Sequence, residues 1–290
     1  MAPGSRHQRE KLAVLCAFWP QALLKDERFD PTPALDALAR RAAAEHPQAF
    51  AWDGQHAEAL LLGTAVHANG EVRQTAPGRF GLGDEVARCL CGLPARWRLT
   101  GLLSLAFRED FAIVDTLAST LPWLAVALPS HWAPEDRVGR RLAEVAQGPW
   151  ADDTLLSQAA DSAGRQDPSS DRWEQFVWTV TDHPRLHAHT DRSTRPRWAD
   201  TPVERAWWRT ERQTFVPLPD LKQAILTMEV DVQPLAQALA APGRARRLHD
   251  AVADMSDAAL ADHGLAPVRE ALLACLTRWE VQPVLPADAP

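Results

Sequence analysis

Two arginines and a glutamate lie close together in the segment Trp208-Arg-Thr-Glu-Arg-Gln-Thr214. The segment has the residue types of a strand, so we expect Arg209 and Glu211 to share one face and Arg212 to point to the other. Guanidinium groups bind carboxylates through paired hydrogen bonds, and two of them beside a glutamate suit the clamping of an acidic ligand group. The alternative is an ion-pair network that only supports the sheet.

A second candidate for ligand binding is His187-Ala-His189. In an extended chain this spacing places both imidazole rings on one side, as a metal or a metal-containing cofactor would require. The same stretch contains charged residues at positions 191, 192 and 195, and two solvated histidines in a polar loop are the ordinary alternative.

Four tryptophans, Trp132, Trp178, Trp207 and Trp208, could wall a planar ligand. Buried tryptophans more often fill core volume. We expect about one of the four to contact a ligand.

Other kinds of active site find little support. Ser130 and His131 are adjacent, so they cannot orient one another as nucleophile and base, and neither a Gly-x-Ser-x-Gly turn nor a Gly-rich phosphate loop occurs. The acidic pairs at positions 109–110 and 152–153 are predicted to be surface charge. Cys89 and Cys91 have no second Cys or His pair nearby, and we expect all cysteines to be free thiols.

Composition limits the partners. The net charge of -7 argues against nucleic acid, which binds clustered and unopposed Lys and Arg. No stretch approaches the roughly 20 apolar residues of a membrane span, and the first ten residues do not resemble a signal peptide. We therefore predict a cytoplasmic protein that does not bind a membrane.

The elements that must position these residues are predicted from hydrophobic periodicity and turn residues. Helices are predicted at residues 33–46, 54–66, 84–93, 234–239, 245–253 and 266–279. Strands are predicted at residues 121–128, 173–180, 209–216 and 224–232, with a hairpin turn at 217–220. The runs at 99–106 and 111–114 fit either type, and 161–171 is predicted to be an exposed loop. The pattern predicts one α+β domain over residues 1–290, with a mostly antiparallel sheet, flanking N- and C-terminal helices and a disordered tail at 281–290.

Three groups of segments carry a family resemblance. They are Pro129-Ser-His-Trp-Ala-Pro134 with Arg137-Val-Gly-Arg-Arg-Leu142, Trp173-Glu-Gln-Phe-Val-Trp-Thr-Val180 with Asp182-His-Pro-Arg-Leu-His187, and Trp208-Arg-Thr-Glu-Arg-Gln-Thr214 with Pro217-Leu-Pro219. Together they resemble the haem-dependent oxidative N-demethylase alpha-subunit family, in matching order and spacing from about residue 107 to residue 240.

The resemblance implies a PAS-like fold, haem b, and oxygen-dependent removal of an N-methyl group from a small amine, with a partner subunit or an electron donor. It makes Glu211 the candidate catalytic residue. The candidates for binding the cofactor are Arg209, Arg212, His187, His189, Trp132 and Trp208.

One departure concerns the axial ligand. The family continues with Ile-His-x-Pro-Val-Pro, whose histidine is the expected ligand of the iron, whereas this chain reads Glu144-Val-Ala-Gln-Gly-Pro-Trp150. The chain has no Tyr, so a substitute must come from a cysteine or from His131, His187 or His189. The alternative is a cofactor-free relative that binds a small molecule or a partner subunit.

Overall fold

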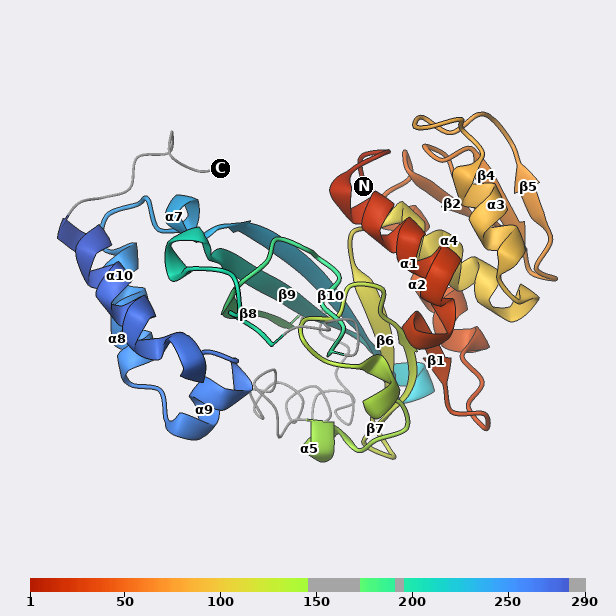
Figure 1. The fold of residues 1–290 in the computed structure, drawn as a ribbon. Helices are drawn as coiled ribbons and strands as arrows, with labels where there is room; N and C mark the ends of the chain where they lie inside the picture. Colours follow the sequence, from red (N-terminus) through yellow and green to blue (C-terminus); the bar gives the residue numbers. More distant parts are fainter. Residues whose placement is uncertain (146–172, 191–195, 282–290) are drawn as a thin grey trace.

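The computed structural model describes residues 1–145, 173–190 and 196–281. At its centre lies sheet A, whose six strands pair antiparallel in the order β1-β7-β6-β10-β9-β8 (Figure 1). The strands are β1 (Leu23–Lys25), β6 (Asp110–Asp115), β7 (Thr120–Ala125), β8 (Trp173–Thr181), β9 (Trp207–Leu218) and β10 (Gln223–Pro234). The prediction of an α+β fold with a mostly antiparallel sheet is confirmed.

The longest pairing in sheet A is the predicted hairpin. Strands β9 and β10 pair along their full length, from Leu218 opposite Gln223 to Trp207 opposite Pro234. A short 3-10 turn at Pro219–Leu221 joins them, followed by Lys222 with φ 53°. The Pro-Asp turn reverses the chain, and the strand residues on both sides of it pair as the predicted antiparallel hairpin.

The N-terminal half adds helices and a second sheet on one side of sheet A (Figure 1). Sheet B has the order β2-β3-β4-β5. Its strands are β2 (Phe50–Trp52), β3 (His56–Ala59), β4 (Thr64–His67) and β5 (Val72–Gln74), and the helices are α1 (Arg6–Ala22), α2 (Thr32–Glu45), α3 (Glu85–Gly92) and α4 (Arg98–Ala106). The predicted helices at 33–46 and 84–93 are confirmed, and the ambiguous runs are a helix (α4) and a strand (β6).

The helix predicted at residues 54–66 is wrong. This stretch forms β3, a turn and β4, because Gly63 adopts φ 56°, a left-handed conformation in which a Cβ would collide with the carbonyl oxygen of Ala76. Its Ala- and Leu-rich composition resembles a helix, but burial alternates along β3 as in a half-buried strand.

Helix α1 was not predicted, since the first part of its inner face is polar. His7, Gln8 and Lys11 are all buried there, so the apolar periodicity of an amphipathic helix is missing. Lys11 Nζ lies 3.0 Å from Asp110 Oδ1 at the start of β6, and both side chains are almost fully buried. The prediction that Asp110 is a surface charge is therefore wrong.

The C-terminal helices pack at the opposite end of β8, β9 and β10 (Figure 1). They are α7 (Leu235–Ala238), α8 (Arg244–Ala253), α9 (Asp257–Asp262) and α10 (Arg269–Val281). A separate hydrophobic cluster lies among them, with Leu248, Leu260 and Leu272 at its centre. The three predicted C-terminal helices are confirmed, whereas the loop predicted at 161–171 and nearly all of the tail lie outside the described residues.

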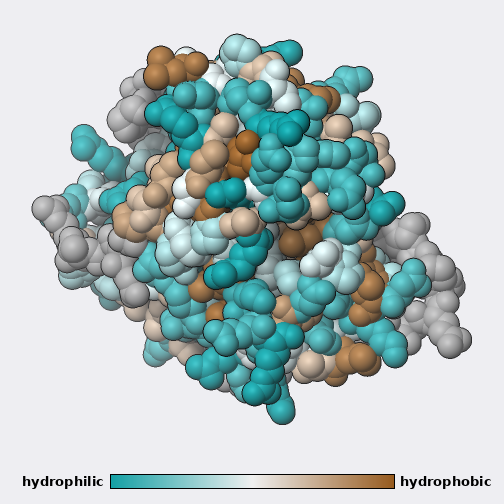
Figure 2. Space-filling model, turned by 90° about the vertical axis from the view of Figure 1, so that its right-hand side faces the viewer, coloured by the Kyte–Doolittle hydropathy of each residue, from teal (hydrophilic) through white to brown (hydrophobic). Residues whose placement is uncertain are grey.

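The face formed by the N-terminal half is mostly hydrophilic, with hydrophobic side chains in small separate groups (Figure 2). Within the described ranges, none of the helices has the length and apolar character needed to cross a bilayer. All four cysteines are free thiols, as predicted.

Candidate functional site

Arg209 lies near the start of β9, the strand beside the edge strand β8, and is only 1% exposed. Its guanidinium donates hydrogen bonds to Ser130 Oγ (2.9 Å) and to the carbonyl oxygens of Pro129 (3.1 Å), Arg185 (3.0 Å) and Leu186 (2.7 Å). Burial lowers its pKa to about 10, so it remains a cation at neutral pH. Arg209 thus joins the loop after β7 to the loop after β8.

Glu211 lies beside Arg209 on the same face of sheet A, as its spacing predicted, and is also buried. It accepts hydrogen bonds from Ser130 Oγ (2.8 Å) and Gln213 Nε2 (2.7 Å), and Gln175 donates in turn to Gln213. Burial raises the pKa of Glu211. The face that carries Arg209 and Glu211, called here the Arg209 face, therefore holds a continuous chain of polar contacts.

The loop after β7 and the loop after β8 also pair directly. Ser130 and Ala188 form a parallel bridge, in which the backbone N–H of His131 donates to the carbonyl of Ala188 (2.8 Å) and that of Ala188 to the carbonyl of Pro129 (3.0 Å). The bridge joins residues that are 58 positions apart, one in the first motif and one directly after the second, next to the guanidinium of Arg209.

His187 and His189 do lie on one side of this extended segment, with nearly parallel rings and centroids 6.1 Å apart. His187 Nδ1 lies 2.8 Å from the carbonyl oxygen of Ala127, and His189 Nε2 lies 2.9 Å from Glu135 Oε2. His189 is only 4% exposed. The alternative of two solvated histidines is therefore wrong for His189.

A second pair of histidines lies close by. His131 Nε2 is 3.2 Å from the hydroxyl of Thr181, and its ring is 5.5 Å from that of His183. Burial lowers the pKa of both rings, that of His183 to about 4. His183 had not been singled out, although it lies in the second motif.

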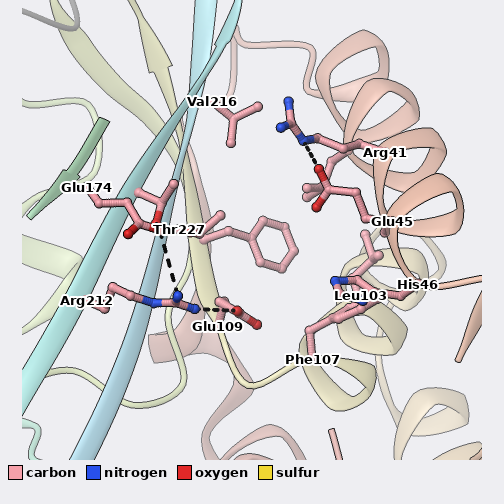
Figure 3. A pocket seen from close by; sticks show the side chains of 14 residues that line it. Arg41, Glu45, His46, Leu103, Phe107, Glu109, Glu174, Arg212, Val216 and Thr227 are labelled. Atoms are coloured by element: carbon pink, nitrogen blue, oxygen red, sulfur yellow. Dashed lines mark hydrogen bonds and ion pairs between the residues drawn. The ribbon is translucent and has the colours of Figure 1, made fainter. Parts of the chain in front are cut away.

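Arg212 points to the opposite face of sheet A, as predicted, and lines a cavity of about 130 Å³ between this face and α2 (Figure 3). It forms ion pairs with Glu229 (2.7 Å), Glu109 (3.6 Å) and Glu174 (3.7 Å). The structure thus separates Arg212 from Arg209 and Glu211.

The lining of the Arg212 cavity combines charge with aromatic surface. Its charged side chains are three glutamates (45, 109 and 174) and two arginines (41 and 212), and so its formal charge is -1. Phe107 and Phe111 contribute aromatic surface. Carboxylates beside aromatic rings suit a small organic cation.

The tryptophans take three different positions. Trp208 stacks on Trp178 with centroids 5.0 Å apart, and both pack against the C-terminal hydrophobic cluster. Trp132 packs on the Arg209 face near Leu142, with the guanidinium of Arg137 5.7 Å from its ring centre. Trp207 packs against the main core. Trp132 follows His131 in the loop after β7, and Trp207 lies opposite Thr181, whose hydroxyl contacts His131.

The residues that the sequence analysis missed are mainly Ser130 and Gln213, which connect Arg209 and Glu211 to their surroundings. Gln213 could have been found, because it follows Glu211 by two residues in a strand and shares its face. Ser130 could not, since its contact with Glu211 spans 81 residues of sequence.

Any nitrogen or sulfur ligand from a His, Cys or Met side chain must come from the described residues. Residues 146–172, 191–195 and 282–290 contain no His, Cys, Met or Tyr, so every such side chain belongs to the described residues. Among these residues, no group of three or more His, Cys, Asp and Glu is arranged to hold a metal ion.

A protein-family model matches most of the chain. The family model described as "Haem-dependent oxidative N-demethylase, alpha subunit-like" matches residues 34–273. No curated protein matches the chain.

Proposed function

Because this chain belongs to the haem-dependent oxidative N-demethylase alpha-subunit-like family, we propose that it is a haem-binding oxidoreductase that demethylates a small amine. The overall reaction converts a methylamine, O₂, two electrons and two protons into the demethylated amine, formaldehyde and water. The electrons come from a partner subunit or a separate donor. Haem supplies the oxygen chemistry, which no side chain performs unaided.

The observation that carries the proposal is the hydrogen bond between His187 and Ala127. A carbonyl oxygen can only accept, so the contact of 2.8 Å with Nδ1 means that Nδ1 carries the proton. When the ring is neutral, its lone pair therefore belongs to Nε2, which is buried. Histidines that bind metals are commonly held in this way, with the other ring nitrogen donating to a carbonyl or carboxylate.

The neighbouring histidines fit less well. His189 uses Nε2 for Glu135, and His131 uses Nε2 for the hydroxyl of Thr181. These contacts differ from the Nδ1-to-carbonyl contact that orients His187. We therefore propose His187 as the substitute axial ligand.

Arg209 and Glu211 act in this proposal as positioning residues. Arg209 fixes the carbonyl of Leu186, which directly precedes His187, and Ser130 ties Arg209 to Glu211. Such contacts hold the segment and the ring of His187 in one orientation. As part of the same proposal, sheet A and the segments that cover it form a PAS-like fold.

An absorption spectrum tests the proposal. The purified protein, titrated with haemin, should develop a strong Soret band that shifts on reduction. His187→Ala should abolish or displace the band, while the matched variants His189→Ala and His131→Ala should retain it. A protein that stays colourless with added haemin would overturn the haem assignment, and an unchanged band in His187→Ala would overturn the choice of ligand.

A second candidate function is cofactor-free binding of a small organic cation, and the Arg212 cavity favours it. Its volume of about 130 Å³ is close to that of a cavity of about 150 Å³ that holds benzene. Tetramethylammonium should then bind to the haem-free protein, and Glu174→Gln should weaken this binding. If calorimetry detects no binding, the second candidate is wrong.

A further inference from the structure

A separate cavity of about 510 Å³ lies between sheet B and the outer strands of sheet A. Strands β1 and β7 of sheet A, β2 and β4 of sheet B, and the first turn of α2 all contribute to its lining. This volume falls in the range of small-molecule binding sites. The cavity includes none of the residues discussed above as site candidates.

Three tryptophans line this cavity, which we call the tryptophan cavity: Trp52, Trp97 and Trp123. The rings of Trp97 and Trp123 lie 5.7 Å apart at 37°, and both are at least 97% buried. Trp52 is fixed by a hydrogen bond from its Nε1 to Asp36 (3.0 Å). Such surfaces favour a flat aromatic ligand, because rings attract one another in offset or tilted contacts.

Trp123 adds a specific polar feature. Its side chain is completely buried, yet its Nε1 has no hydrogen-bond partner within the described residues. Buried indole N–H groups normally find an acceptor, and leaving one unpaired is unfavourable. A ligand with an acceptor atom would satisfy this donor.

The charges at the cavity favour an anion. Among the described residues Arg96 has no carboxylate partner, and Lys25 donates only to the backbone carbonyls of Glu27 and Phe29. The carboxylates that line the cavity are Asp36, which is paired with Arg40 outside it, and Asp30. Lys25 and Asp30 interact with each other, so Arg96 is the lining cation that has no carboxylate partner among the described residues.

We propose that the tryptophan cavity binds a planar aromatic carboxylate that also carries a ring acceptor. The ring lies among the tryptophans, the acceptor receives the hydrogen bond of Trp123 Nε1, and the carboxylate meets Arg96. This site is independent of haem and of the Arg212 cavity.

Calorimetry with three matched probes tests each part. Quinoline-6-carboxylate has both groups, naphthalene-2-carboxylate lacks the ring acceptor, and 6-methylquinoline lacks the charge. The first probe should bind most tightly to the wild-type protein, by about fivefold or more over each of the others.

Two variants separate the contacts. Trp123→Phe should weaken quinoline-6-carboxylate about fivefold relative to naphthalene-2-carboxylate, because only the former uses the indole N–H. Arg96→Gln should weaken both carboxylates and leave 6-methylquinoline unchanged. Trp279→Phe on α10 and Arg9→Gln on α1 are the matched controls and should alter none of the three.

Three results would overturn the proposal: no binding of any probe at millimolar concentration, equal binding of all three probes, or equal effects of the test and control variants. The comparison of two probes within each variant does not depend on its overall stability. It therefore distinguishes a lost contact from a damaged fold.

Discussion

Arg209 and Arg212 are three residues apart in one strand and carry the same charge, but their surroundings differ. Arg209 is buried and donates to one hydroxyl and three backbone carbonyls. The side chain of Arg212 is 39% exposed and forms ion pairs with several glutamates. Removal of the buried arginine would leave its acceptors buried and without a hydrogen-bond donor. Substitution of the two arginines should therefore affect stability very differently.

We predict that Arg209→Met lowers the free energy of unfolding by roughly 3–5 kcal/mol. The matched variant Arg212→Met should change it by less than about 1 kcal/mol, as is typical of exposed ion pairs. Urea unfolding followed by circular dichroism measures both. Equal losses would contradict the structural role assigned to Arg209.

The lowered pKa values of His131 and His183 predict a loss of stability in acid. Both rings stay neutral in the folded protein below the ordinary pKa of 6.5, whereas the unfolded chain takes up the protons. For His183 the loss should begin near pH 6.5 and end near pH 4, at up to about 1.4 kcal/mol per pH unit. His183→Asn should flatten this part of the pH profile of unfolding. A profile unchanged by the substitution would show that His183 titrates normally.

At the scale of elements, the helix α1 and strand β6 are joined by a buried ion pair that the sequence analysis did not reveal. Lys11 reaches Asp110 and also donates to the carbonyl of Glu109 (2.6 Å), while Asp110 accepts from the backbone of Leu128 (2.6 Å). One side chain thus connects α1 to the start of β6, and its partner connects β6 to the end of the β7 segment.

Lys11→Met should cost roughly 3–5 kcal/mol, because it leaves the carboxylate of Asp110 buried and unpaired. The double variant Lys11→Met/Asp110→Asn should recover part of this loss. Arg40→Met removes an exposed ion pair on α2 and provides the control, for which little change in stability is expected. Thermal or urea unfolding would contradict the prediction if Lys11→Met behaved like the control.

Elements whose residues alternate or repeat regularly could be predicted from the sequence, and others could not. The β9–β10 hairpin has branched and aromatic strand residues on both sides of a Pro-Asp turn, so local signals agree. In α1 the first three buried residues, His7, Gln8 and Lys11, are polar, and in residues 54–66 a left-handed glycine overrides the helix-forming residues. For the site, the opposite facing of Arg209 and Arg212 followed from spacing alone, whereas the contacts of Arg209 with two distant loops are non-local and left no signal in the sequence.

At the scale of the whole molecule, three hydrophobic clusters surround one sheet. The main cluster lies toward α1 to α4, another lies among the C-terminal helices, and the third lies on the Arg209 face. Strand β10 contributes residues to the first and the third, and Val180 of β8 and Trp208 of β9 belong to the second. Because the strands of one sheet reach all three, we predict that they form one cooperative domain.

Leu105→Ala in the main cluster and Leu276→Ala in the C-terminal cluster should each lower the stability by roughly 2–5 kcal/mol. Both should shift one and the same unfolding transition, with coincident changes in tryptophan fluorescence and far-ultraviolet circular dichroism. Two separate transitions, with Leu276→Ala moving only one of them, would instead indicate two domains.

The regular alternation along β9 has a consequence for length variation in relatives of this chain. Successive side chains from Trp207 to Leu218 enter different layers, so one inserted or deleted residue would exchange the contents of the two layers. Arg212 would then point to the Arg209 face of the sheet, and Glu211 would point to the opposite face, toward α2. Insertions should therefore be tolerated at the turn of residues 219–222 but not within the strand.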